Sequence, residues 1–192
     1  ELTEHQPKTM VKVQGTPILA HIVDAYNAVG VKDIVVVRGY KKETVNLPNL
    51  TYVDNDDYAD TGELASLLTA LQSRKGRAQQ TLISYGDVLF NKYIPQSLCQ
   101  EADDCVIFLD SNWREQTSYA RLGGFAECTI PNSRRAFNAK VYLKQLGGEI
   151  PEANTHGVWM GFLKVSPAAA TLITGVITEL LAQPGNRKAT IP

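Results

Sequence analysis

Two residues far apart in the sequence could together carry out phosphoryl or nucleotidyl chemistry. Asp87 follows Gly86 directly after an apolar run, residues 81–85. A carboxylate at such a position is a suitable ligand for Mg²⁺, which prefers one or two carboxylates together with phosphate oxygens. Lys8 follows Pro7 in a polar segment, and a lysine held by a rigid loop could neutralise phosphate charge. Both residues also fit simpler roles, as a turn or capping aspartate and as a solvated surface lysine.

A glycine at the start of a predicted helix is a second candidate. Gly62 opens the helix predicted over residues 62–72 and follows Asp60 and Thr61. A glycine-led helix N-terminus can offer bare N–H groups to an anion or to the edge of a base, although the same pattern occurs as plain capping. The acidic side chains in this stretch could recruit a metal ion or belong to a solvated loop: Asp54, Asp56, Asp57 and Asp60.

Two further strand ends and two tryptophans complete the set of candidates. Gly39 and Asp110 each come just after a predicted strand, and open α/β sheets bind ligands beyond the carboxyl ends of their strands. Trp113 and Trp159 could line a pocket for a cationic head group through the π faces of their rings. Core packing is the simpler role for both tryptophans.

Composition excludes several classes of protein. The 192 residues carry a formal net charge of −1 and are 44% hydrophobic and 20% charged, which is ordinary for a soluble globular domain. A global basic field for nucleic acid is absent, and the apolar runs are far shorter than the ~20 residues of a membrane-spanning helix. Three cysteines without CxxC spacing do not indicate a disulfide framework or a structural zinc site. We therefore expect a cytoplasmic protein without nucleic-acid or membrane partners.

The elements that must position these residues follow an α/β pattern. Thr16 fits a helix N-cap, Pro17 fits the first helical position, and Gly30 fits the end of that helix. The unbroken β-branched run at 34–37 is typical of a strand buried on both faces. Later strands are predicted at 51–53, 81–85 and 105–109, and a short helix at 92–102.

The pattern changes between Ser111 and Asn154. Helical periodicity fades there, and short strand-like pieces predict a small β-rich insertion over residues 111–154. Those pieces are 119–122, 125–128 and 141–143. A strand over 158–165 then returns to the core, and a helix follows with Ser166 as its cap and Pro167 at its first position.

Several of these segments together resemble the sugar-nucleotidyltransferase superfamily. The resemblance is clear over about residues 1–110. It implies a three-layer α/β/α, Rossmann-like fold with a mixed, mainly parallel sheet. The segments that carry it are Pro7-Lys8, Gly15-Thr16-Pro17, Val29 to Ile34, Gly39-Tyr40 and Gly86-Asp87.

Within that superfamily, two resemblances are closer. Residues 52–71 are similar to cytidylyltransferases that act on phosphocholine or 2-aminoethylphosphonate. Residues 37–56 and 156–166 look like nucleotidyltransferase domains fused to phosphoenolpyruvate mutase, in phosphonate biosynthesis. The resemblance implies transfer of CMP from CTP to a small phosphonate with release of pyrophosphate. Phosphocholine or a sugar 1-phosphate as acceptor, and a catalytically inactive nucleotide-binding domain, remain alternatives.

The resemblance also implies roles for individual residues. Lys8 would contact the triphosphate and the attacked α-phosphate, and Asp87 would bind Mg²⁺. No protein nucleophile is implied, because an oxygen of the acceptor attacks directly. The acceptor side would be formed by Asp110, Trp113 and Trp159. The nucleotide would be bound by Lys8, Gly39, Asp60, Thr61, Gly62, Ser66 and Gly86.

The sequence departs from the superfamily pattern at two places. The glycine-rich loop that normally precedes the Pro-Lys pair is absent before Pro7, and a second metal-binding aspartate is not found before Pro192. We therefore expect a single nucleotidyltransferase domain over residues 1–192 that is truncated at both ends and belongs to a larger multidomain chain. The chain as given could be inactive.

Overall fold

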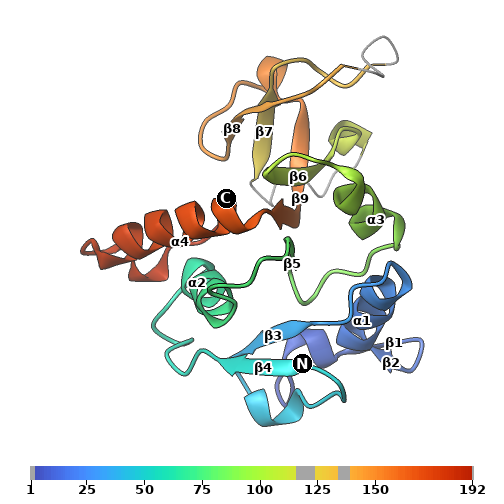
Figure 1. Ribbon diagram of the computed structural model, residues 1–192, viewed down its shortest axis with the longest axis vertical. Helices are drawn as coiled ribbons and strands as arrows, with labels where there is room; N and C mark the ends of the chain where they lie inside the picture. Colours follow the sequence, from blue (N-terminus) through green and yellow to red (C-terminus); the bar gives the residue numbers. More distant parts are fainter. Residues whose placement is uncertain (1–2, 116–123, 134–138, 192) are drawn as a thin grey trace. The chain divides into compact units, whose positions relative to one another are not determined.

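The computed structural model describes residues 3–115, 124–133 and 139–191 (Figure 1). It divides into two compact units: the residues up to Val106 together with Leu163–Ile191, and Ile107–Phe162. The described residues form four α-helices and nine β-strands, which confirms the predicted mixed α/β class. The insertion predicted over residues 111–154 falls within the second unit.

The first unit begins with a hairpin. The strands β1 (Lys12–Val13) and β2 (Thr16–Pro17) pair antiparallel around a turn in which Gly15 has a φ of +82°. Helix α1 (Ile18–Ala28) follows directly. The prediction that Thr16 caps this helix is wrong, because Thr16 pairs with Val13 in the hairpin and Pro17 occupies the N-cap position.

The end of α1 matches the prediction. Gly30 follows the helix with a φ of +87°, a left-handed conformation that glycine adopts without steric cost. The helix buries an apolar face formed by Leu19, Ile22 and Tyr26. The ring of Tyr26 packs edge to face against Phe90, with the ring centroids 5.4 Å apart.

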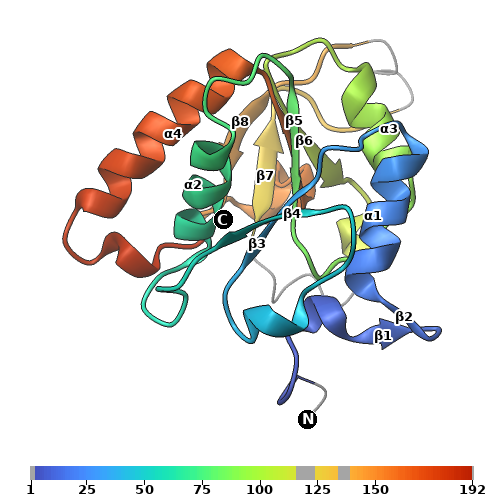
Figure 2. The same cartoon turned by 60° about the horizontal axis from the view of Figure 1, so that its bottom comes forward.

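A parallel strand pair places two charged residues side by side. The strands β3 (Val35–Arg38) and β4 (Thr51–Asp54) are paired from Val35–Thr51 to Arg38–Asp54. Helix α2 (Glu63–Ser73) follows β4 and packs against β3 and α4 (Figure 2). The carboxyl ends of β3 and β4 therefore bring Arg38 and Asp54 to the same edge.

The remaining elements match the predicted order. They are β5 (Thr81–Ser84), α3 (Tyr93–Gln100), β6 (Cys105–Asp110), β9 (Gly157–Val165) and α4 (Pro167–Ala182). The Oγ of Ser166 accepts a hydrogen bond from the Ala169 N–H, and Pro167 stands in the first turn, so the predicted cap of α4 is confirmed. The largest sheet has the order β5-β9-β7-β8, with β6 also paired to β9.

The second unit contains two further strands. The predicted strand 125–128 is confirmed as β7 (Phe125–Cys128), which pairs antiparallel with β8 (Leu143–Leu146) and with β9. The strand predicted at 141–143 lies slightly later, as β8, while the one predicted at 119–122 lies outside the described residues. Phe162 is almost fully buried and packs edge to face against Phe108.

Two general features bear on the predicted class of protein. Among the described residues, none of the helices combines the length and the apolar character that crossing a membrane would need. All three cysteines are free: Cys99 and Cys105 are exposed, and Cys128 is buried.

Candidate active site

The structure places Lys8 and Asp87, the two candidate catalytic residues, next to each other. Lys8 opens a short 3₁₀ helix, Lys8–Met10, behind Pro7, and Asp87 follows the end of β5. The Nζ of Lys8 lies 3.7 Å from Oδ2 of Asp87. The side chains are 75% and 39% exposed, so this ion pair adds little stability and both charges are accessible to a ligand.

The 3₁₀ helix of Lys8 lies directly against the strand end that carries Asp87. A Cβ atom placed on Gly86 would have the Oγ1 of Thr9 as its nearest neighbour, at 3.7 Å. This Oγ1 is itself buried and has no hydrogen-bond partner. Sequence reasoning did not single out Thr9, and its position next to Lys8 is the one signal that could have done so.

Asp87 fits the magnesium ion that the family resemblance implies. It offers a partly exposed carboxylate, and Mg²⁺ commonly binds one or two carboxylates and completes its coordination with phosphate oxygens and water. The described residues contain no cluster of three or more His, Cys, Asp or Glu side chains placed to hold a metal. A metal at this position would therefore depend on the nucleotide for most of its ligands.

The N-terminus of α2 is occupied by another part of the chain. The N–H of Gly62 donates to the carbonyl of Arg187 at 3.1 Å, and the N–H of Leu64 donates to that of Ala189 at 3.3 Å. A Cβ on Gly62 would lie 2.2 Å from the Ala189 oxygen. These N–H groups are thus not bare, and a glycine is needed here for the close approach of residues 187–189. Contact of Gly62 with a base stays a prediction.

A buried asparagine connects two other predicted nucleotide-binding residues. The Nδ2 of Asn55 donates to Oγ1 of Thr61 at 3.0 Å and to Oγ of Ser66 at 3.2 Å. Thr61 in turn donates to the carbonyl of Asp57. The loop after β4 and the first turns of α2 are therefore held together by Asn55. Asp60, also predicted to bind the nucleotide, is exposed in the same loop.

A tyrosine at the end of β5 joins this helix to the strand end of Asp87. The hydroxyl of Tyr85 donates to Oε2 of Glu63 at 3.0 Å, and the N–H of Ile191 donates to the same oxygen at 3.2 Å. Burial, reinforced by the charge of Glu63, raises the pKa of the Tyr85 hydroxyl, so this hydroxyl is a hydrogen-bond donor at neutral pH. Nothing in the sequence pattern marked Glu63 or Tyr85.

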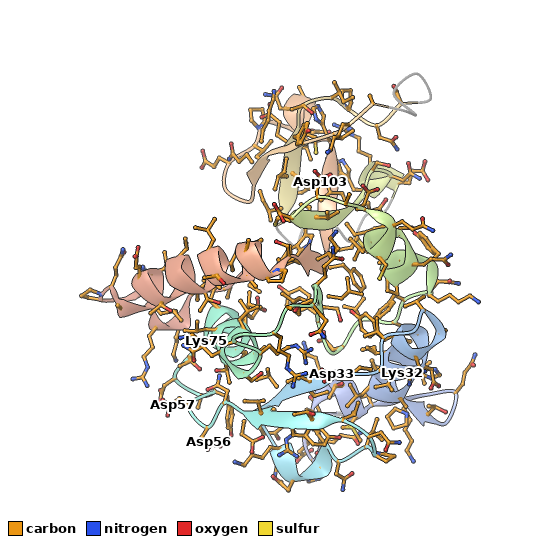
Figure 3. All side chains as sticks on the ribbon, in the orientation of Figure 1. Lys32, Asp33, Asp56, Asp57, Lys75 and Asp103 are labelled. Atoms are coloured by element: carbon orange, nitrogen blue, oxygen red, sulfur yellow. The ribbon has the colours of Figure 1, made fainter. Side chains whose placement is uncertain are left out.

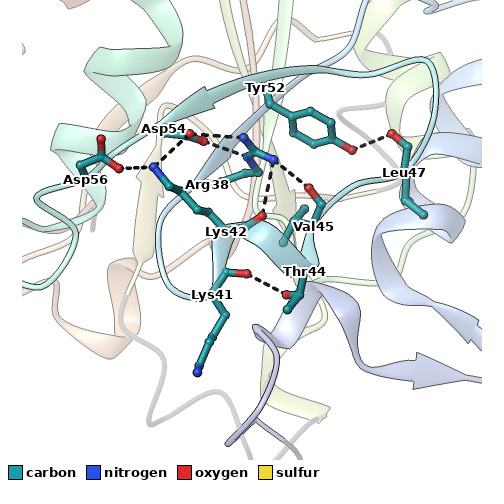
Figure 4. A network of polar contacts seen from close by, with 9 residues as sticks. All are labelled: Arg38, Lys41, Lys42, Thr44, Val45, Leu47, Tyr52, Asp54 and Asp56. Carbon is teal, nitrogen blue, oxygen red and sulfur yellow. Dashed lines mark hydrogen bonds and ion pairs between the residues drawn. The ribbon is translucent and has the colours of Figure 1, made fainter.

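The carboxyl ends of β3 and β4 are joined by an ion-pair network (Figure 4). Arg38 donates through Nε to Oδ1 of Asp54 at 2.8 Å and through Nη2 to Oδ2 at 3.2 Å. Its guanidinium also donates to the Val45 carbonyl and lies 4.3 Å from the centroid of the Tyr52 ring. The hydrogen bond from Arg38 lowers the pKa of the Asp54 carboxyl.

The acidic cluster after β4 is paired with cations. Lys42 reaches Asp54 at 3.3 Å and Asp56 at 2.6 Å, and Arg187 reaches Asp57 at 3.0 Å. Asp56 and Asp57 lie on the loop between β4 and α2 (Figure 3). The solvated-loop alternative fits these contacts better than recruitment of a metal.

Gly39 has a packing reason for being a glycine. A Cβ at this position would lie 2.7 Å from the Cβ of Tyr58. The Tyr58 ring in turn packs edge to face against Tyr40, whose hydroxyl donates to the Glu4 carbonyl. Contact between Gly39 and a nucleotide stays a prediction.

The predicted acceptor-side residues belong to the second unit. Asp110 accepts a hydrogen bond from the Asn112 N–H at 2.8 Å, and the Trp159 indole donates to the Phe162 carbonyl at 3.0 Å. The guanidinium of Arg114 lies 4.5 Å from the ring centroid of Trp113, whose Nε1 is buried without a hydrogen-bond partner. Internal contacts thus account for Trp159, and acceptor binding by all three predicted residues stays a prediction.

Comparison with known families decides the class of this domain. The family model described as MobA-like NTP transferase domain matches residues 3–147. The chain belongs to this family. The predicted relationship to nucleotidyltransferases is therefore confirmed.

Relatives of this NTP transferase domain use different nucleotides and acceptors. UTP–glucose-1-phosphate uridylyltransferase of Haloferax volcanii is 30% identical over 129 residues, which cover 62% of this chain and 51% of that protein. The 2-aminoethylphosphonate cytidylyltransferase of Lancefieldella rimae is 32% identical over 75 residues, 36% of this chain and 30% of that protein. The NTP transferase domain thus spans about half the length, or less, of these relatives.

A solved structure shares the fold. The CTP:phosphocholine cytidylyltransferase of Streptococcus pneumoniae aligns with a TM-score of 0.60 at 16% sequence identity. The alignment covers 98% of the NTP transferase domain described here and 74% of the solved chain. At this identity the likeness concerns the fold alone.

Proposed function

We propose that this NTP transferase domain transfers CMP from CTP to a small phosphonate of the 2-aminoethylphosphonate type and releases pyrophosphate. The observation that carries the proposal is the pairing of Lys8 and Asp87, an accessible cation and carboxylate at the end of β5. A triphosphate with its metal ion needs a cation to neutralise phosphate charge and a carboxylate to bind the metal. The phosphonate acceptor is supported by the similarity to 2-aminoethylphosphonate cytidylyltransferase.

The reaction needs no nucleophile from the protein. An oxygen of the phosphonate attacks the α-phosphorus of CTP, a new P–O bond forms, and the bond to the bridging oxygen of the β-phosphate breaks, so that pyrophosphate leaves. Lys8 places its ammonium against the charge that develops on the phosphate oxygens. Asp87 would hold Mg²⁺, which when bound neutralises triphosphate charge. The contribution of the chain is positioning and charge stabilisation.

A second candidate is uridylyl transfer to a sugar 1-phosphate. The similarity to UTP–glucose-1-phosphate uridylyltransferase favours it, because that alignment covers more of this chain than the phosphonate relative does. The chemistry at Lys8 and Asp87 would be the same, and only the base and the acceptor would differ. A nucleotide-binding domain without turnover is the third candidate.

A pyrophosphate-release assay separates these candidates. CTP, UTP, dTTP and ATP are each tested with 2-aminoethylphosphonate, phosphocholine and glucose 1-phosphate in the presence of Mg²⁺. We expect the highest kcat/KM for CTP with 2-aminoethylphosphonate. A higher value for UTP with glucose 1-phosphate would replace the proposal by the second candidate. Nucleotide binding without pyrophosphate from any pair would leave the third.

A further inference from the structure

Glu63 lies where three parts of the first unit meet. It is the first residue of α2, and its Oε2 accepts hydrogen bonds from the hydroxyl of Tyr85, at the end of β5, and from the N–H of Ile191. One carboxylate oxygen thus joins the start of a helix, the end of a strand and the segment near residue 191. Glu63 is itself exposed, so these hydrogen bonds, and not burial, fix the position of its carboxylate.

The segment that supplies the Ile191 N–H is docked firmly on α2. It accepts two backbone hydrogen bonds, from Gly62 and Leu64, at the carbonyls of Arg187 and Ala189. The side chain of Arg187 pairs with Asp57 at 3.0 Å. The close approach at Gly62 leaves no room for a side chain. Glu63 is therefore held from one side by a segment that is itself fixed to the helix.

On its other side, Glu63 accepts the hydrogen bond from Tyr85, which lies two residues before Asp87. Tyr85 is followed by Gly86, whose lack of a side chain makes the backbone between Tyr85 and Asp87 easy to turn. Because Gly86 leaves this stretch with few restraints of its own, the hydrogen bond from Tyr85 to Glu63 is one contact that limits movement of the strand end that carries Asp87.

We propose that Glu63 is a positioning residue that, through Tyr85, holds Asp87 in the orientation needed to bind a nucleotide-bound divalent cation. The inference rests on the proposed function, since it assigns Asp87 to that cation. Glu63 itself contacts neither the nucleotide nor the reacting groups in this assignment. Its role depends on accepting hydrogen bonds, which a glutamine can also do.

Three variants test the role of this hydrogen-bond acceptor. Glu63→Ala removes the acceptor, Tyr85→Phe removes the donor, and Glu63→Gln keeps an acceptor oxygen without the charge. Mn²⁺ binding in the presence of CTP is measured by electron paramagnetic resonance, together with the Mg²⁺ concentration for half-maximal turnover. We expect the first two variants to weaken Mn²⁺ binding about 3- to 10-fold, as the loss of one hydrogen bond of ordinary net strength implies, and Glu63→Gln to retain most of the affinity.

The double variant and a matched glutamate control sharpen the result. Both single changes break the hydrogen bond between Tyr85 and Glu63, and Glu63→Ala also removes the acceptor of the Ile191 N–H, so the double variant should weaken Mn²⁺ binding no more than Glu63→Ala alone. Glu179→Ala removes an exposed glutamate from α4 and should leave Mn²⁺ binding at the wild-type value. Fully additive losses in the double variant would contradict transmission through Tyr85.

Hydrogen exchange separates failure of this inference from failure of the proposed function. Exchange of the Gly86 and Asp87 amides, measured without any ligand, should be faster in Glu63→Ala and in Tyr85→Phe than in the wild type, and unchanged in Glu179→Ala. Wild-type protein that neither binds CTP nor releases pyrophosphate would overturn the proposed function and, with it, the assignment of Asp87 to the cation. Unchanged amide exchange in both folded variants would overturn the positioning role of Glu63, whatever the activity. Should Glu63→Ala fail to fold, Tyr85→Phe still gives the answer.

Discussion

The Nζ of Lys8 lies 3.7 Å from Oδ2 of Asp87, although one residue precedes α1 and the other follows β5. A contact this long between exposed groups contributes little to folding stability. The ammonium of Lys8 and the carboxylate of Asp87 can therefore still bind other charged groups. A triphosphate with its metal ion could take up both, with the phosphates at Lys8 and the metal at Asp87.

Replacement of Asp87 by alanine should abolish metal-dependent pyrophosphate release while leaving the fold intact. The residue is outside the core, so its removal creates no cavity, but it takes away the carboxylate that would hold the metal. We expect kcat/KM to fall by at least about 100-fold, with an unchanged thermal unfolding midpoint. The matched control is Asp24→Asn, on the exposed face of α1, which should behave as wild type. Activity of Asp87→Ala near the wild-type level would remove Asp87 from the site.

Replacement of Lys8 by alanine should lower the rate of transfer. An ammonium aimed at developing phosphate charge typically contributes about 10²–10³-fold, and its loss should appear mainly in kcat. Lys8→Arg should recover part of the rate, because it keeps the charge but not the geometry. Steady-state kinetics with Lys12→Ala as control, an exposed lysine of the neighbouring hairpin, checks the effect. Equal rates for Lys8→Ala and Lys12→Ala would make Lys8 an ordinary surface residue.

Most helices and strands could be predicted from short stretches of the sequence, because the residues that start and end them lie within the same stretch. Ser166 with Pro167 marked the start of α4, and Gly30 marked the end of α1. Thr16 misled the prediction because a capping residue and a hairpin residue look alike until the partner strand is known. Residue propensity alone cannot identify a partner strand, because strand pairing depends on the whole fold.

In the candidate site, too, single residues could be predicted from the sequence, but contacts between distant segments could not. Lys8 and Asp87 were predicted separately from residue type and position, and the structure placed them together. The link from Glu63 to Tyr85 and Ile191 joins three separate segments, and no pattern within any one segment announces it. Gly62 carried a visible signal, but its close contact with Ala189 could not be read from its neighbours in sequence.

A matched pair of glycine substitutions tests the docking of residues 187–189 on α2. Gly62→Ala places a Cβ 2.2 Å from the Ala189 oxygen, so either this segment or the helix start must move. We expect the free energy of unfolding to fall by about 1–3 kcal/mol. Gly175→Ala, inside α4 with open space around the added Cβ, should instead raise it by about 0.5–1 kcal/mol. Urea denaturation measures both changes, and a neutral effect of Gly62→Ala would mean that the segment is not held at α2.

The pair formed by Arg38 and Asp54 should make stability depend on pH in the acid range. Its hydrogen bonds hold the pKa of Asp54 below the ordinary value, so the folded state binds this proton less readily than the unfolded state. The stabilisation is therefore present above the unfolded pKa of about 4 and is lost as the pH falls through the lower folded pKa. Asp54→Asn should destabilise by about 1 kcal/mol at pH 7, since the pair is bidentate and partly buried. Urea denaturation between pH 2 and 7 should show this difference shrinking below about pH 4, whereas the exposed control Asp24→Asn should show none. A difference that stays constant down to pH 2 would mean that packing, and not the charge of Asp54, causes the loss.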